Sequence, residues 1–290
     1  MKTFEYVAPN SLAEAVSLLE SAGPLAHPLA GGTDILPQMR YFRVHPTLVV
    51  DVKRIPELRR LGFAGDGLHI GAAVSLADIA AHPDVTRLYP AIAYSCGLVG
   101  SVQIRNRATL GGNLCNAAPS ADTVPGLICL GARAVVTGPA GTREIPVEEF
   151  NIGPGETVLG TGELLVKVVV PPPPNRNAVS YLRFTPRQEM DIAVVGVASM
   201  ITANDDGLVS HVRIVMAAVG PTHLRAHRAE SVLEGQRPTA ELINRVAEEA
   251  AGECRPISDV RASAEYRRHL VTVLTRRTLG ACAAAQDIKV

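Results

Sequence analysis

Apolar and polar residues alternate along the first part of this chain in a pattern that predicts helices and strands in turn. Ser11 and Glu14 form a capping box before an apolar stripe, which predicts a helix that ends at Gly23-Pro24. Short apolar runs predict strands at residues 25–30, 48–52 and 68–71. The alternation of helix and strand predicts a mixed α/β unit that ends near residue 55.

A second unit follows and ends at an unusual run of four prolines. Apolar periodicity predicts helices over residues 75–81 and 90–98, and β-branched runs predict strands over residues 134–136 and 164–170. Prolines cannot donate to a sheet ladder, so residues 171–174 are predicted to form a stiff, extended linker.

The pattern changes after the prolines. Two strand-like runs at 192–202 and 208–219 flank the turn signal Asn204-Asp205-Asp206-Gly207, which predicts a hairpin. Two or three helical segments are then predicted, at residues 226–234, 239–252 and 263–284. Strands followed by helices are typical of an α+β domain. We therefore predict a first domain over residues 1–174, with subdomains at about 1–55 and 56–174, and a second domain over residues 175–290.

Composition narrows the class of protein. The chain has 290 residues, of which 47% are hydrophobic and 19% charged, and its formal net charge is zero. A neutral chain of this kind is unlike nucleic-acid binders, which usually carry a basic excess. It shows no apolar run of membrane-spanning length and no signal-peptide core, so we expect a cytoplasmic protein. Its five cysteines are scattered without a C-x-x-C pair, and we expect no iron–sulfur cluster in this chain.

Two stretches carry adjacent glycines between short polar residues. The first is Ala30-Gly31-Gly32-Thr33-Asp34, and the second is Thr109-Leu110-Gly111-Gly112-Asn113, which Asp122 follows at the predicted start of a helix. Glycine allows positive φ and lets the backbone lie against a ligand, and successive free N–H groups form an anion-binding concavity. The alternative is a pair of tight turns that cap helices. Neither stretch has a P-loop ending, and G-x-G-x-x-G is absent.

A third stretch belongs with the two glycine stretches. It consists of Tyr181-Leu182-Arg183-Phe184, followed by Arg187-Gln188-Glu189-Met190-Asp191-Ile192-Ala193. In their order and spacing the three stretches resemble the FAD-binding medium subunits of molybdenum hydroxylases, over essentially the whole chain. The resemblance implies a two-part FAD-binding α/β domain of the PCMH type, followed by a C-terminal domain with a small antiparallel sheet and a helical bundle.

The resemblance also implies which residues contact FAD. The glycine loops would hold its pyrophosphate, Asp122 would lie near the ribityl–phosphate region, and Arg183 and Ile192 near the isoalloxazine ring. The expected FAD-binding residues are Leu29, Ala30, Gly31, Gly32, Thr33, Asp34, Ile35, Thr109, Leu110, Gly111, Gly112, Asn113, Asp122, Leu165, Arg183, Asp191 and Ile192. No catalytic acid or base and no covalent flavin link is expected.

The function that the resemblance implies is electron transfer. Non-covalent FAD would take electrons from [2Fe–2S] clusters in a small partner subunit and pass them to an external acceptor. A large partner would hold the molybdenum cofactor, in a heterotrimer that dimerises in some relatives. Two alternatives remain: a self-sufficient FAD oxidase or reductase of the same fold, and a non-catalytic nucleotide-binding module. His223 and His227 have the i, i+4 spacing of a metal pair but lack a third ligand, so no metal site is predicted.

Overall fold

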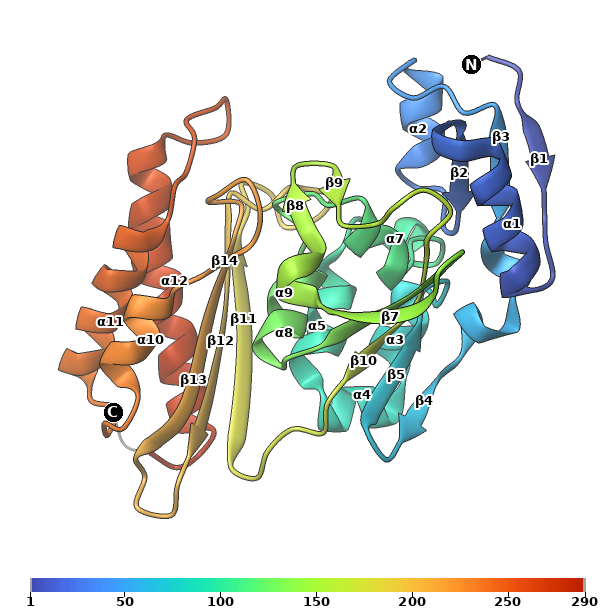
Figure 1. The fold of residues 1–290 in the computed structure, drawn as a ribbon. Helices are drawn as coiled ribbons and strands as arrows, with labels where there is room; N and C mark the ends of the chain where they lie inside the picture. The colour runs from blue at the N-terminus through green and yellow to red at the C-terminus, as the bar shows by residue number, and fades with distance from the viewer. Residues whose placement is uncertain (1, 289–290) are drawn as a thin grey trace.

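The structure, a computed structural model, describes residues 2–288 (Figure 1). The first unit is a three-stranded parallel sheet with strand order β1-β3-β2, and the strongly apolar β3 lies in the centre. Its elements are β1 (Glu5–Val7), α1 (Leu12–Ala22), η1 (Gly23–Leu25), β2 (Ala26–Leu29), α2 (Ile35–Arg40), β3 (Leu48–Asp51) and η2 (Val52–Arg54).

The predicted start of α1 is confirmed. The Ser11 hydroxyl accepts a hydrogen bond from the backbone N–H of Glu14 at 3.3 Å, and the Glu14 carboxylate accepts one from the backbone N–H of Asn10 at 3.1 Å. The helix ends at Gly23, whose φ of +64° favours glycine.

The second unit is built on a five-stranded antiparallel sheet with strand order β4-β5-β10-β6-β7, and helices cover one of its faces (Figure 1). The predicted strands at 134–136 and 164–170 are β6 and β10, and the predicted helices at 75–81 and 90–98 are α3 and α5. Its elements are η3 (Pro56–Arg59), β4 (Leu61–Ala64), β5 (Gly67–Gly71), α3 (Leu76–Ala81), α4 (Pro83–Leu88), α5 (Pro90–Leu98), α6 (Val102–Arg105), α7 (Leu110–Cys115), α8 (Thr123–Cys129), β6 (Arg133–Gly138), β7 (Gly141–Pro146), α9 (Val147–Phe150), β8 (Asn151–Gly153), β9 (Glu156–Thr157) and β10 (Leu164–Val170).

The third unit is a four-stranded antiparallel sheet, in the order β11-β12-β13-β14, with three helices on one face. The predicted hairpin at 204–207 joins β12 to β13, and all three predicted C-terminal helices form. The elements are β11 (Asn177–Phe184), β12 (Val195–Ala203), β13 (Val209–Ala217), β14 (Leu224–Arg225), α10 (His227–Leu233), α11 (Ala240–Glu253) and α12 (Ala264–Ala284).

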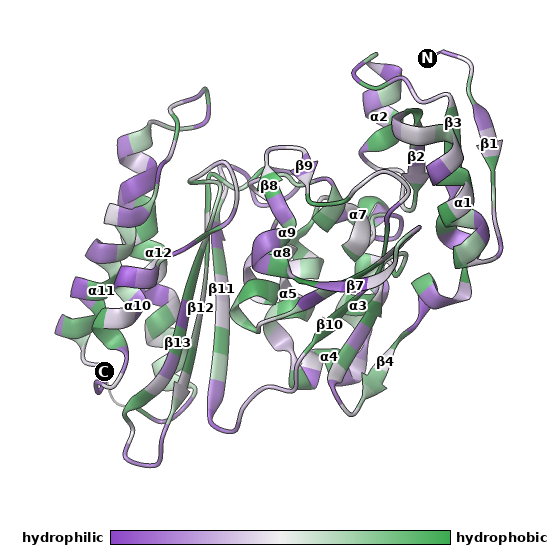
Figure 2. Ribbon diagram, viewed as in Figure 1, coloured by the Kyte–Doolittle hydropathy of each residue, from purple (hydrophilic) through white to green (hydrophobic). Residues whose placement is uncertain are grey.

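The sheet of the third unit is buried between two helical layers. Helices α10 and α12 contact one face, and α5 and α8 of the second unit contact the other. Every residue of β12 is therefore buried, and hydrophobic residues run along β12 and β13 in Figure 2. The core that begins at Ala15 in the first unit extends through α8 to Met200 and Val215 in this sheet. The C-terminal sheet thus faces the segment that contains Asp122.

The architecture confirms the predicted α+β class, and it corrects two details. Strand β11 was not predicted, and β12 begins at Val195 rather than Ile192. Within the described residues, no helix combines the length and the apolar character needed to cross a membrane.

Candidate functional site

The first glycine stretch forms a loop between β2 and α2, as predicted. Gly32 has a φ of +79°, a conformation that side chains with a Cβ rarely adopt. The backbone N–H groups from Gly31 to Ile35 donate to no other group among the described residues. The loop therefore presents a series of unused donors, which is the arrangement that binds an anion without a metal.

The second glycine stretch differs from the prediction, because its glycines lie in the first turn of α7 rather than in an open turn. The Thr109 hydroxyl caps α7 and accepts from the N–H of Gly112 at 3.0 Å, while the N–H of Gly111 donates to the carbonyl oxygen of Ala72 at 3.1 Å. A Cβ on Gly111 would lie 2.5 Å from that oxygen. The glycine is required here for close packing, and the stretch does not offer the free N–H groups that we predicted.

Contacts at the borders of the two stretches bring them near each other. A Cβ on Gly31 would come 2.1 Å from the carbonyl oxygen of Arg107, just before the second stretch. Gln38 of α2 donates through Nε2 to Oδ1 of Asn116, at 3.4 Å, beyond the end of α7. The structure therefore brings the first two motifs together, although they are far apart in the sequence.

Asp122 precedes α8, but it does not cap the helix as predicted. Its backbone is helical, and its side chain makes no cap hydrogen bond. Instead, Oδ1 accepts from the Tyr181 hydroxyl at 2.7 Å, and Oδ2 accepts from Nη1 of Arg183 at 2.5 Å. Both members of the Arg183–Asp122 pair are almost fully buried, with side-chain exposures of 7% and 9%.

Burial and pairing act on the Asp122 carboxyl in opposite directions. Desolvation raises the pKa of Asp122 above its ordinary value, and the Arg183 charge and the hydrogen bonds from Tyr181 and Arg183 offset only part of that rise. Arg183 also donates through Nη2 to the carbonyl oxygen of Leu98 at 2.9 Å. These contacts hold the third motif against the second.

Strand β11 explains why Tyr181 and Arg183 reach the same carboxylate. Residues two apart on a strand point to the same face, and this face lies against α5 and α8. Tyr181 was not among the predicted site residues, although its spacing of two residues from Arg183 places both side chains on one face of a strand. Arg183 is opposite Gly196 of β12, and a Cβ on Gly196 would lie 2.6 Å from the Tyr181 hydroxyl.

Asn113 and Leu165 occupy different environments. The Thr123 hydroxyl donates to Oδ1 of Asn113 at 2.6 Å, so α7 and α8 are linked beside Asp122. Leu165 lies in β10, which contacts α7, and it is 2% exposed. Its side chain belongs to the core beneath the site rather than to an open surface.

Asp191 and Ile192 lie in the loop between β11 and β12, and the predicted strand start at Ile192 is wrong. The Asp191 carboxylate accepts from its own neighbour, the N–H of Ile192, at 2.9 Å and from the N–H of Arg187 at 3.0 Å. Ile192 is 47% exposed. Together with Pro119 and Ser120 it lines a cavity of about 410 Å³, which connects the third motif to the residues just before Asp122.

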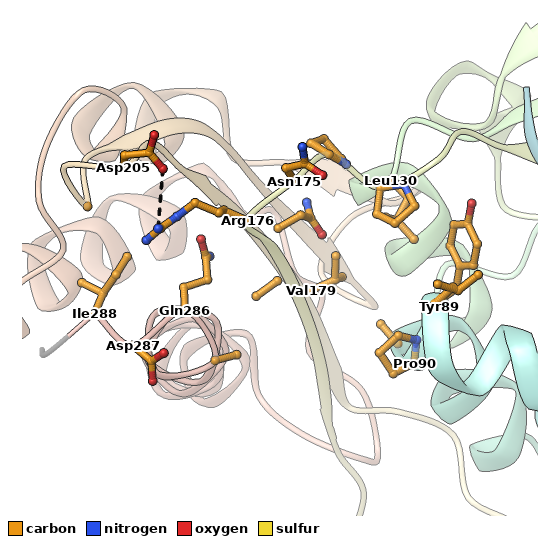
Figure 3. A pocket seen from close by; sticks show the side chains of 18 of the residues that line it. Tyr89, Pro90, Leu130, Asn175, Arg176, Val179, Asp205, Gln286, Asp287 and Ile288 are labelled. Atoms are coloured by element: carbon orange, nitrogen blue, oxygen red, sulfur yellow. Dashed lines mark ion pairs between the residues drawn. The ribbon is translucent and has the colours of Figure 1, made fainter.

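A larger cavity, of about 1150 Å³, opens elsewhere in the molecule (Figure 3). It lies between Tyr89 and Leu130 of the second unit and the start of β11, and Arg176 and Asp205 form an ion pair of 3.7 Å on its other side. None of the predicted FAD-binding residues lines it.

The two histidines with helical spacing do not share a helix. His223 precedes β14 and its ring Nε2 lies 3.1 Å from the carbonyl oxygen of Ala121, while His227 opens α10. Burial lowers the pKa of His223 to about 4, so the ring is neutral near pH 7 and donates through Nε2. Across residues 2–288, no group of three or more His, Cys, Asp or Glu side chains is arranged to hold a metal ion.

The residues of the first loop fit the diphosphate of a dinucleotide such as FAD. Donors from Gly31 to Ile35 are unused, two of these residues have no side chain, and Thr33 adds a hydroxyl. Asn113 is linked to α8 through Thr123, and Asp122 and Arg183 form a buried pair beside the start of that helix.

Comparison with known proteins gives matches over nearly the whole chain. The family described as the FAD binding domain in molybdopterin dehydrogenase matches residues 2–173, and the CO dehydrogenase flavoprotein C-terminal domain matches residues 180–282. The carbon monoxide dehydrogenase medium chain of Hydrogenophaga pseudoflava is 34% identical over 278 residues, covering 96% of each chain. The xanthine dehydrogenase FAD-binding subunit of Escherichia coli O157:H7 is 32% identical over 282 residues, covering 97% of this chain and 96% of the relative.

Solved structures agree with these matches. Carbon monoxide dehydrogenase from Hydrogenophaga pseudoflava contains a chain that superposes with a TM-score of 0.94 at 35% identity, covering 98% of each chain. Quinoline 2-oxidoreductase from Pseudomonas putida 86 contains one with a TM-score of 0.92 at 30% identity, covering 99% of each chain.

Proposed function

This chain belongs to the FAD-binding medium subunits of the molybdenum hydroxylases, and we propose that it is the electron-transfer flavoprotein of such a complex. In this proposal it receives electrons from [2Fe–2S] clusters of a small partner subunit and passes them to an external acceptor. A large partner holds the molybdenum cofactor. The three chains form a heterotrimer.

The observation that carries the proposal is a loop of unused backbone donors whose Gly31 lies against the backbone just before the second glycine stretch. The N–H groups from Gly31 to Ile35 would bind the diphosphate of FAD, which needs donors rather than a metal. Because Gly31 lies against Arg107, this loop and the second motif would face one ligand. Bound FAD supplies the redox chemistry of the subunit.

The remaining predicted residues have distinct tasks in this proposal. The Asp122–Arg183 pair would set the charge beside the flavin, and a cation near the ring favours the reduced, electron-rich flavin. Ile192, exposed at the adjacent cavity, would shield the ring from water. None of the described residues is required as a catalytic acid or base, because the flavin carries the redox step.

The state of the cysteines supports a reducing compartment as part of the same proposal. All five are free thiols, and four of them are buried. Proteins of the cytoplasm keep their thiols reduced, and we place this chain there.

Reduction of the flavin by a partner tests the proposed electron transfer. The chain is co-expressed with the molybdenum and iron–sulfur subunits, and the complex is mixed with the substrate of the molybdenum subunit without oxygen. Bleaching of the flavin absorption in the complex, but not in the isolated chain, is the expected result. A chain that is reduced by an organic substrate on its own would instead be a self-sufficient oxidase or reductase.

A further inference from the structure

Tyr181 makes a buried contact that the resemblance does not explain. Its side chain lies between the second and third units, and its hydroxyl donates to Oδ1 of Asp122 at 2.7 Å. Tyr181 is only 3% exposed, so water cannot replace this hydrogen bond. The other oxygen, Oδ2, is held by Arg183. Each oxygen of the buried carboxylate therefore has one defined donor.

The neighbouring strand leaves room for the tyrosine hydroxyl. Gly196 lies inside the fully buried strand β12, where glycine weakens a sheet and packs no side chain. A Cβ at this position would meet the Tyr181 hydroxyl at 2.6 Å and Cβ of Ala217 at 3.3 Å. Gly196 therefore lowers the stability of the sheet, but it leaves the space that the Tyr181 hydroxyl occupies.

We propose that Tyr181 is a positioning residue of the flavin site, which keeps Asp122 ionised and oriented so that Asp122 balances the charge of Arg183. This inference rests on the proposed function, because Asp122 and Arg183 are the groups expected beside the flavin. Tyr181 touches neither the flavin nor the reacting atoms in this account. It acts through Asp122.

The charged surroundings of Asp122 define the expected effect. Arg183 and Tyr181 face it from β11, Tyr94 of α5 lies near Tyr181, and His223 contacts the preceding residue, Ala121, from the loop before β14. Of these, only Tyr181 and Arg183 donate to the carboxylate. Loss of the tyrosine hydroxyl leaves Oδ1 without a donor, and protonation of Asp122 then becomes easier. A protonated Asp122 no longer balances Arg183.

The test uses the full chain loaded with FAD, and it measures two quantities as a function of pH. The first is the titration of the Asp122 carboxyl carbon, followed by NMR in chain labelled at aspartate and assigned with Asp122→Asn. The second is the reduction potential of the bound flavin. In Tyr181→Phe we expect the Asp122 midpoint to rise by about one to two pH units, the equivalent of one hydrogen bond to a charged group.

The reduction potential of the flavin should reflect the shift of the Asp122 midpoint. At pH values between the Asp122 midpoint of the wild type and that of Tyr181→Phe, the flavin potential of Tyr181→Phe should be more positive than that of the wild type. In this range the variant has a protonated Asp122, which leaves the Arg183 charge unbalanced. Tyr89→Phe is the matched control, since this buried hydroxyl donates to the carbonyl oxygen of Pro171 at 3.1 Å and does not contact Asp122. Tyr89→Phe should change neither the pH midpoint of Asp122 nor the reduction potential of the flavin.

A second variant keeps the tyrosine and moves its hydroxyl. Gly196→Ala should displace the hydroxyl and raise the Asp122 midpoint as Tyr181→Phe does, and the double variant should equal Tyr181→Phe rather than the sum of the two. An unchanged Asp122 midpoint in both single variants would overturn the inference. So would a shifted Asp122 midpoint with no change in flavin potential, because Tyr181 would then be only structural. A wild type that binds no FAD, either alone or in its complex with the partner subunits, would instead defeat the proposed function.

Discussion

Gly31 lies so close to Arg107 that a Cβ on the glycine would be 2.1 Å from the arginine carbonyl oxygen. Movement of a side chain cannot relieve this contact, because the atoms opposite Gly31 belong to the backbone. The first loop can approach the second motif only if residue 31 is glycine.

The first prediction concerns this contact. Gly31→Ala should push the two stretches apart, lower the free energy of unfolding by about 1–3 kcal/mol, as overpacking does, and weaken FAD binding. Gly65→Ala is the matched control, because a Cβ there meets nothing within 4 Å. Urea unfolding and FAD titration of both variants measure the effect. If the two variants had the same free energy of unfolding and the same FAD affinity, the close approach of Gly31 to Arg107 would contribute to neither.

The second prediction concerns the buried ion pair. Arg183→Met leaves the Asp122 carboxylate buried without its counter-ion, and should cost about 3–5 kcal/mol of unfolding free energy. The control is Arg87→Met, which breaks the exposed 2.7 Å pair with Asp84 and should cost less than about 1 kcal/mol. Urea unfolding at neutral pH measures both costs.

The pH dependence of the Arg183→Met cost has a definite sign. Removal of the arginine raises the pKa of Asp122 further, and a group with a raised pKa stabilises the fold below its unfolded pKa and loses that effect as pH rises through the folded value. The variant should therefore be closest to the wild type in acid and furthest from it at neutral pH. The opposite trend would mean that Asp122 is not the group left unpaired.

The third prediction concerns His223. Burial lowers the pKa of this ring from 6.5 to about 4, so the unfolded chain binds the proton more readily than the folded chain in that range. Stability should fall as pH is lowered through this window, by up to roughly 3 kcal/mol. His223→Gln keeps an N–H donor but does not titrate, and this part of the acid dependence should be absent in its urea unfolding curves. If the unfolding free energy of His223→Gln fell with decreasing pH as steeply as that of the wild type, the effect would belong to another group.

The fourth prediction concerns thiol reactivity. Burial raises the pKa of the Cys96 and Cys282 thiols to about 12, and desolvation does the same for the half-buried Cys115, so almost no reactive thiolate exists near neutral pH. These three thiols should resist alkylation by iodoacetamide in the folded protein and react after unfolding in urea. Mass spectrometry of the labelled peptides measures each site. Rapid labelling of Cys115 in the folded protein would show that α7 opens readily.

Much of the fold could be predicted, because it depends on local patterns. The capping box at Ser11, the hairpin at 204–207 and the three C-terminal helices each have a short-range signal, and each is present. Strand β11 was missed for a physical reason. Ala178, Leu182 and Phe184 pack toward the C-terminal helices, while Val179 and Tyr181 pack toward the second unit, so both faces are apolar and no clean alternation results.

The local geometry at the predicted site could be predicted only in part. Gly32 has the positive φ that the glycine pair predicts, whereas Gly111 is a glycine because α7 packs against Ala72. The sequence cannot distinguish these two causes, since tertiary contacts decide between them. The same holds for Asp122, whose position before a helix suggests a cap, while β11 supplies the stronger partners Tyr181 and Arg183.

Binding of FAD at the first loop can be measured by the visible absorption spectrum of the purified, FAD-treated chain. The wild type should show the bands of oxidised flavin at one FAD per chain. Gly32→Val should lose them, because valine is strained at a φ of +79° and the loop would have to change its conformation. Gly155→Val is the control, with a comparable φ of +78° in a turn outside the predicted site, and it should keep them. A colourless wild type, alone and in its complex, or full flavin content in Gly32→Val, would contradict the account.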